Sequence, residues 1–344
     1  MNDTQTGHVV IVSHEYALLC LRALSHREPH LRIQDYVVPA NRQNTIARAA
    51  TPTGSEVRKL LNLREHARTA CAGGPRETIC PQILVSSKDS RVRSPYYHEH
   101  YMSQPLPTDA LWKTLGTDVY CSSPEMIFAQ LSKGASMVDL CMLGMELCGS
   151  YGLPYIPDLP LVNRDPLTTP ERLSRTLGEL DGYGPRSNAG RALACIAAGS
   201  ASPMESRLFL ALTAPRSMGG LNLPRPLLND PVSITREQQR LLGKGNLKCD
   251  LIWPEHRLAL EYESHEHHGR IDNYEATMAR NAVLQMNGIK VISISASTFY
   301  NYDKLMTIVD QIKHTLGLRH RPETEQMQRK TRELLRLLGD APSF

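Results

Sequence analysis

The stretch LKCDLIWPEHRLALEYE, residues 247 to 263, decides the fold of the C-terminal half of this chain. Apolar and polar residues alternate on both sides of the segment PEHR at 254–257, as they do in strands that have two different faces. Four residues between two such runs suit a hairpin built around a type I turn. We therefore predict an antiparallel hairpin of residues 247–253 and 257–263.

The turn length also predicts which residues face each other. Pairing outward from the turn places Asp250 opposite Glu261 and Lys248 opposite Glu263. Opposed residues share a face of the sheet, with Cβ atoms about 5 Å apart. One interpretation is a solvated charged face on which Lys248 pairs with Glu263. The other is a divalent cation site, because the opposed carboxylates of Asp250 and Glu261 repel each other without a cation.

A polar segment, SHEHHG at 264–269, follows the second strand and contains three histidines. Oxygen ligands from two or three carboxylates favour Mg²⁺ or Mn²⁺, and such an ion can position a phosphodiester and lower the pKa of a bound water. Two alternatives remain open for the histidines. They belong to a solvated loop, or His265 and His267 bind Zn²⁺, although no cluster of further zinc ligands lies nearby in sequence.

The composition is that of an ordinary globular protein. The chain has 344 residues, 41% of them hydrophobic and 22% charged, which predicts two domains. No apolar run is long enough to cross a membrane and the N-terminus lacks the layout of a signal peptide, so we expect a cytoplasmic protein without a membrane partner. The eight cysteines show no CxxC pair and are expected to be reduced thiols. After residue 185 there are 21 Lys and Arg against 16 Asp and Glu, a net charge of +5, which permits a polyanionic partner.

Turn residues and capping residues divide the chain. Five prolines between Pro154 and Pro170, followed by DGYGPRSN at 181–188, interrupt regular structure. We expect an N-terminal mixed α/β domain at 1–153, a Pro/Gly-rich linker at 154–187, an α/β domain at 188–318 and a C-terminal amphipathic helix at 319–344. Within the third segment the pattern predicts a helix from Pro203, the hairpin, a helix at about 271–286, a strand at KVISIS and a helix at about 302–316.

An Asp before a hairpin, a Glu-x-Glu strand, a histidine, a helix and a strand after Gly form a combination that resembles the PD-(D/E)XK nuclease superfamily. The closest branch is that of the very-short-patch repair endonuclease, and the match covers about residues 200–315. The resemblance implies a restriction-endonuclease-like fold, with a mixed sheet flanked by helices. It also implies endonuclease activity on DNA that depends on Mg²⁺ or Mn²⁺, in phage defence or DNA repair.

The resemblance assigns roles to individual positions. Asp250 would be the central metal ligand and Glu261 the second acid. Glu263 stands where that branch usually has Asp. His268, or His267, would match the histidine that serves as acid or base.

Other roles have competing explanations. Glu263 occupies the position of the superfamily's lysine, so either Lys248 substitutes from the neighbouring strand or no lysine acts. Glu205 would supply an acid and metal ligand from the first helix, or it closes a capping box by reaching back to the N-cap N–H. Arg270 and Arg280 would contact phosphates of the nucleic acid, or they are solvated.

The rest of the chain supports two rival functions. The N-terminal stretches VIVSHEYALLCLRAL, VYCSSPEMIFAQL and LGMELCGSYG resemble regions joined to this nuclease-like domain in bacterial proteins of the abortive-infection antitoxin type. The rival implied by this resemblance is a DNA-binding regulator that keeps the fold without catalysis. A structural interaction protein is the third hypothesis. It rests on the leucine stripe of the last helix, which would dock on its own domain or on a second chain to form a homodimer: Leu334, Leu335, Leu337 and Leu338.

Overall fold

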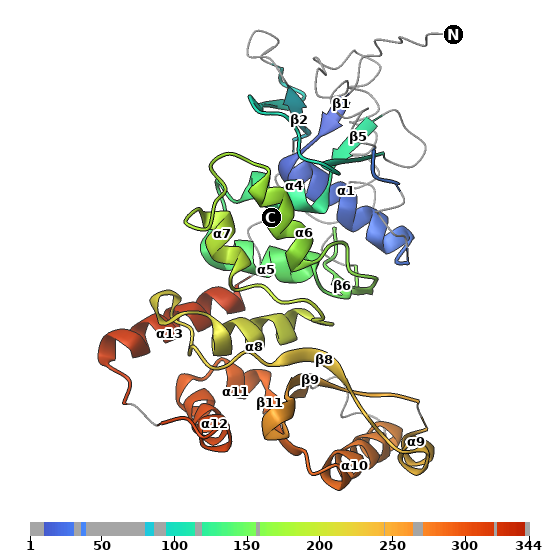
Figure 1. The fold of residues 1–344 in the computed structure, drawn as a ribbon, viewed down its shortest axis with the longest axis vertical. Helices are drawn as coiled ribbons and strands as arrows, with labels where there is room; N and C mark the ends of the chain where they lie inside the picture. Colours follow the sequence, from blue (N-terminus) through green and yellow to red (C-terminus); the bar gives the residue numbers. More distant parts are fainter. Residues whose placement is uncertain are drawn as a thin grey trace. The chain divides into compact units, whose positions relative to one another are not determined.

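The protein is described by a computed structural model, drawn in Figure 1. It describes residues 10–30, 36–38, 80–85, 94–113, 119–155, 159–243, 245–263, 271–319 and 322–340, with 271–277 as backbone alone. The chain divides into two units, Met1–Ala194 and Cys195–Ser343. Both contain helices and strands, so the predicted α/β class is confirmed. None of the helices in the described part of the chain combines the length and apolar character that crossing a membrane requires.

The first unit is built on a five-stranded sheet of order β3-β2-β1-β5-β4. The pairs β1–β5 and β2–β3 are parallel, whereas β1–β2 and β4–β5 are antiparallel, so this sheet is mixed. The strands are β1 (Val10–Val12), β2 (Gln82–Val85), β3 (His98–Tyr101), β4 (Leu111–Lys113) and β5 (Val119–Ser122). The helices are α1 (His14–Arg27), α4 (Pro124–Leu131), α5 (Met137–Leu147), α6 (Pro170–Gly178) and α7 (Asn188–Leu193), and β6 (Tyr151–Gly152) pairs with β7 (Val162–Asn163).

Helix caps in the first unit follow the sequence in one case and depart from it in another. Ser123, followed by Pro124 in the sequence, caps α4 with its Oγ, which accepts the Met126 N–H at 3.3 Å. Ser13 precedes α1 but makes no side-chain cap; its Oγ instead contacts His14 Nδ1 at 2.9 Å. The side chain of Gln130 on α4 accepts the His14 N–H, also at 2.9 Å. A partner distant in sequence has thus replaced the local cap.

The predicted linker at 154–187 belongs to the first unit. It contributes β7 and α6, and the α6 residues Leu173 and Leu177 are buried. The division between the units lies at Ala194 and Cys195 instead. Prolines at helix starts and in short irregular stretches explain the difference. Pro170 is the first residue of α6, and the Thr169 side chain caps this helix by accepting the Arg172 N–H.

The second unit is built on a four-stranded sheet of order β11-β10-β9-β8, in which β10–β11 is parallel and the other pairs are antiparallel. The strands are β8 (Leu227–Val232), β9 (Leu247–Trp253), β10 (Leu258–Glu263) and β11 (Lys290–Ser295). The helices are α8 (Pro203–Thr213), α9 (Arg236–Leu242), α10 (Ile271–Met286), α11 (Ala296–Phe299), α12 (Tyr302–Thr315) and α13 (Glu325–Gly339). One core cluster joins β9, β10 and α10: Leu247, Cys249, Ile252, Ala259, Val283, Leu284 and Ile289.

The predicted hairpin is confirmed. Trp253 lies opposite Leu258 and Leu251 opposite Leu260, as the turn length requires. The turn is a short 3₁₀ helix, Pro254–His256, and Arg257 adopts a left-handed backbone at φ 47° before the chain enters β10. The helix predicted at 271–286 and the strand predicted at KVISIS are also present with those bounds.

Three of the four leucines in the stripe of α13 are buried within their own unit, and Leu337 is partly exposed. Leu334, Leu335 and Leu338 are at most 3% exposed, and the helix contacts α8, α12 and the 3₁₀ turn Arg216–Met218. Gly219, at φ 90°, permits this approach, because a Cβ there would lie 2.3 Å from the Lys330 carbonyl oxygen. The stripe therefore docks on its own domain, and the homodimer alternative has no support from it.

The cysteines that the structure describes are free thiols, as predicted. Cys121, Cys141, Cys148, Cys195 and Cys249 are buried.

Candidate functional site

The sheet of the second unit is interrupted at Asp250. The β8–β9 ladder pairs the residues on both sides of Asp250, while Asn229 opposite it adopts a left-handed backbone at φ 50°. On the other side, the β9–β10 ladder reaches Leu251 and Leu260. There Asp250 Oδ2 accepts the Tyr262 backbone N–H at 2.8 Å, so a carboxylate replaces a strand carbonyl as the acceptor. Asp250 therefore lies at a position of β9 that belongs to neither the β8 ladder nor the β10 ladder.

Glu261 is bound by an arginine from α10. The Nη2 group of Arg280 donates to both carboxylate oxygens, at 2.8 Å to Oε1 and 2.7 Å to Oε2. The same Nη2 also donates to the backbone oxygen of Lys248 on β9. The Glu261 side chain is 14% exposed and that of Arg280 29%, so this ion pair lies at the edge of the interior.

Glu205 comes from the first turn of α8. Its Oε2 accepts the Ala201 backbone N–H at 2.7 Å and the Asn229 Nδ2–H at 2.5 Å. Its own N–H donates to Ser202 Oγ at 3.2 Å. The predicted capping box is therefore half right: Ser202 caps the helix, but Glu205 reaches Ala201 instead of the Ser202 N–H. The two alternatives for Glu205 are compatible, since it helps to cap α8 and also faces Asp250.

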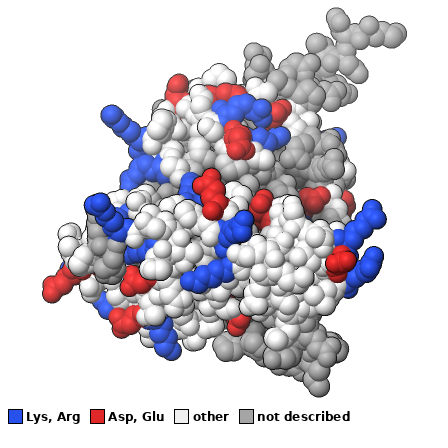
Figure 2. Space-filling model, turned by 60° about the horizontal axis from the view of Figure 1, so that its bottom comes forward, with Lys and Arg blue, Asp and Glu red and all other residues white. Residues whose placement is uncertain are grey.

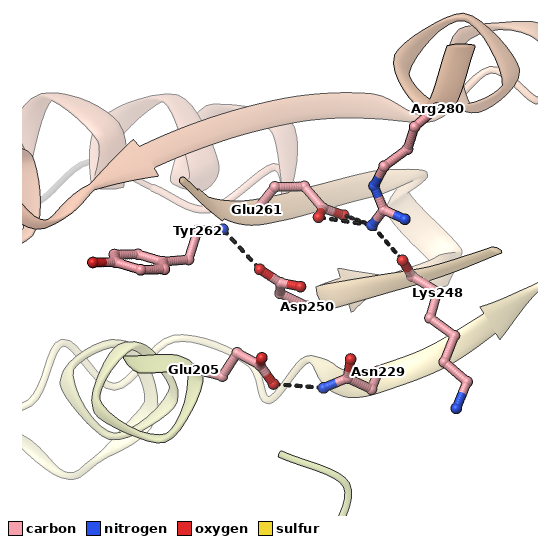
Figure 3. A network of polar contacts seen from close by, with 7 residues as sticks. All are labelled: Glu205, Asn229, Lys248, Asp250, Glu261, Tyr262 and Arg280. Atoms are coloured by element: carbon pink, nitrogen blue, oxygen red, sulfur yellow. Dashed lines mark hydrogen bonds and ion pairs between the residues drawn. The ribbon is translucent and has the colours of Figure 1, made fainter. Parts of the chain in front are cut away.

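The three carboxylates come from three elements and interact electrostatically. Figure 3 shows Asp250 between Glu261 on one side and Glu205 on the other. Burial and the Asp250 charge raise the pKa of Glu205 from 4.5 to about 7. The same two causes raise the pKa of Glu261 to about 7, although Arg280 opposes them. Burial raises the pKa of Asp250 as well.

Two other predicted residues do not join this cluster. Lys248 is exposed, and its side chain extends away from Glu261 (Figure 3). Glu263 is exposed at the end of β10. The interruption at Asp250 explains this, because the regular ladder that would oppose Lys248 and Glu263 stops at Leu251. The predicted single face with four charges is replaced by a row of three acids.

The remaining predicted residues divide between the described and undescribed parts of the chain. His265, His267, His268 and Arg270 lie outside the described residues, so their predicted roles stay predictions. Arg280 is not a free solvated side chain, because it pairs with Glu261.

Asn229 holds Glu205 but was not predicted from the sequence. The signal for it was Asn-Asp-Pro at 229–231, since Asn adopts the left-handed region more readily than most residues.

The fit of a divalent cation can be tested on the donor set. Glu205, Asp250 and Glu261 offer only oxygen atoms, the ligand type that Mg²⁺ and Mn²⁺ prefer. Burial raises the pKa of all three, and the Asp250 charge adds to the rise at Glu205 and Glu261, so the surroundings disfavour their ionised forms. Yet no three His, Cys, Asp or Glu side chains in the described part of the chain are grouped closely enough to hold an ion as they stand. The oxygen atoms suit a divalent cation chemically. The three acids are not grouped closely enough to hold one as they stand, and Arg280 is paired with one of them, Glu261.

Charge over the surface is mixed. On the face drawn in Figure 2, Lys and Arg alternate with Asp and Glu over the described residues and do not gather in one basic patch. Comparison of the chain with family models, with curated proteins and with solved structures finds no match.

Proposed function

We propose that the second unit is a restriction-endonuclease-like domain that hydrolyses phosphodiester bonds of DNA with a divalent ion held by Asp250, Glu261 and Glu205. A bound Mg²⁺ or Mn²⁺ would supply an activated water and stabilise charge on the phosphate. The observation that carries the proposal is the row of three acids, buried Glu205 and half-buried Asp250 and Glu261, with one arginine. Such a row costs stability unless a cation or protons neutralise it.

The surrounding chain orients these acids in a manner that suits ligand binding. The Tyr262 N–H holds Asp250, while the Ala201 N–H and the Asn229 side chain hold Glu205. These hydrogen-bond donors are backbone N–H groups and the side chain of a strand residue, and they restrict rotation of the two carboxylates. This preorganisation favours binding of a cation over collapse of the site.

A cleavage assay on supercoiled plasmid tests the proposal. Nicking is expected with Mg²⁺ or Mn²⁺ and is expected to disappear with EDTA. Asp250→Asn should abolish it, because the isosteric amide removes the central negative charge. Asp230→Asn on the neighbouring strand β8 is the matched control and should cut normally. Equal cutting by Asp250→Asn and the parent protein in Mn²⁺ would show that the site is elsewhere.

The regulator hypothesis is the second candidate, and the Arg280–Glu261 ion pair favours it. Glu261 already has a counter-ion, and Glu263 stands where the superfamily has its lysine. A regulator would bind DNA equally well with EDTA and would cut none. The same assay therefore separates the two candidates.

A further inference from the structure

Arg280 and a divalent cation compete for one carboxylate. The Arg280 Nη2 contacts both oxygens of Glu261, at 2.8 and 2.7 Å. A cation bound to either oxygen would lie against the guanidinium, and the two positive charges would repel each other. Glu261 can therefore serve as a metal ligand only when Arg280 moves or finds another anion.

The geometry of Arg280 shows where such an anion would bind. Its hydrogen bonds to described residues all come from Nη2, which has three acceptors on Glu261 and Lys248. Nη2 carries only two hydrogens, so these three acceptors share them. The two edges of a guanidinium that present parallel N–H groups pair Nη2 with Nε or with Nη1, and the Arg280 side chain is 29% exposed. An anion that takes two parallel N–H groups must therefore take Nη2 from Glu261.

A phosphodiester is the anion whose shape fits. The planar guanidinium binds two phosphate oxygens with two parallel N–H groups, an arrangement that competes well with a carboxylate. The nearby acids repel any anion when no cation is present. Phosphate and cation therefore help each other: the phosphate takes Arg280 from Glu261, and the cation neutralises the acids that repel the phosphate.

We infer that Arg280 exchanges between Glu261 and a phosphate of the nucleic acid, so that the domain binds its divalent cation and its DNA cooperatively. This inference rests on the proposed function. The Arg280–Glu261 pair is then the closed form of the site, which binds the cation weakly in the absence of DNA. Binding of DNA converts it to the open form.

Two binding measurements with Ca²⁺ test the inference without a cleavage readout. The first measures the affinity of a fluorescent duplex DNA in Ca²⁺ and in EDTA at constant ionic strength. Ca²⁺ should tighten binding to the wild-type protein by roughly five- to a hundredfold, the range typical of coupled sites. The second measures Ca²⁺ affinity without DNA by calorimetry. Arg280→Gln should bind Ca²⁺ more tightly than the wild type by a similar factor, and its DNA affinity should respond less to Ca²⁺.

The control variant is Arg240→Gln, which removes an equal charge from an exposed position on α9. It should keep both the wild-type Ca²⁺ affinity and the effect of Ca²⁺ on DNA binding. Equal Ca²⁺ affinity of wild type and Arg280→Gln would overturn the inference and leave the metal site standing. If neither protein binds Ca²⁺, with or without DNA, the proposed function fails as well. If Arg280→Gln does not fold, the wild-type titration decides alone, because a DNA affinity that ignores Ca²⁺ excludes the coupling.

Discussion

Replacing Glu205 with glutamine should make the protein more stable at pH 8. Burial and the Asp250 charge raise the pKa of Glu205 from 4.5 to about 7. At about 1.4 kcal/mol per pH unit, the difference corresponds to about 3 kcal/mol of destabilisation when the group is ionised. The Gln side chain carries no charge, and its oxygen can accept the same N–H groups from Ala201 and Asn229. We expect Glu205→Gln to raise the free energy of unfolding by up to about 3 kcal/mol.

The size of the stability gain from Glu205→Gln depends on pH in a way that identifies its cause. Because the folded pKa of Glu205 is raised, the folded protein keeps a proton that the unfolded chain has lost between pH 4.5 and about 7. The wild type therefore loses stability as pH rises through this window, and the loss is complete above pH 7. The advantage of Glu205→Gln should be close to zero below pH 4.5 and reach its full value above pH 7.

Urea unfolding at pH 4.5, 6 and 8, followed by circular dichroism, measures this difference. Glu255→Gln, at an exposed position in the hairpin turn, is the control and should change stability little at any pH. Addition of Mn²⁺ should then stabilise the wild type more than Glu205→Gln, since the variant lacks the negatively charged carboxylate at position 205. A Glu205→Gln protein that is less stable than the wild type at pH 8, or whose advantage does not change with pH, would refute the electrostatic argument.

Three further substitutions test the framework of the two units by the same unfolding measurement. Leu334→Ala in the buried face of α13 should cost about 2–5 kcal/mol, whereas Leu337→Ala, at a partly exposed position, should cost much less; equal losses would contradict the docking of α13. Glu146→Gln should destabilise the first unit by about 3–5 kcal/mol, because it leaves buried Arg22, which donates to both Glu146 carboxylate oxygens, without its acid. Asn229→Ala should cost about 1–2 kcal/mol, because alanine is strained at φ 50° and cannot donate to Glu205; Asn229→Gly should recover the backbone part only.

The hairpin and its flanking elements were predictable because their signals are local. Alternation in LKCDLIW and RLALEYE, a four-residue turn and a helix ending at Asn287-Gly288 each depend on a few neighbouring residues. Because these local signals agree with one another, they predict the order of the helices and strands from the hairpin onward in the second unit. Strand β8 was missed because Pro231 lies within it and argues against a central strand. The sheet order places β8 at an edge, where a proline is tolerated.

The site itself depends on departures from regular structure, and these are harder to predict. The register predicts Asp250 opposite Glu261, but the ladder ends one residue earlier and Asp250 binds the Tyr262 N–H instead. Nothing in the alternation of β9 and β10 indicates where two strands stop pairing. The partner of Glu261 was equally hidden, since Arg280 is distant in sequence and one of many arginines in this half of the chain.

The two units differ in how they compensate acids that are buried or half-buried, and this contrast supports the proposed function. Glu146 in the first unit is 2% exposed; burial alone would raise its pKa, but Arg22 and Arg164 lower it below the ordinary value. Its charge is thus fully compensated by side chains of the same unit. Glu205, Asp250 and Glu261 share one arginine, and their pKa values rise. A chain that neutralises one buried acid with two arginines could do the same for three. Under the proposed function a cation from outside would neutralise them, and Glu205→Gln would measure the cost in stability of leaving them without it.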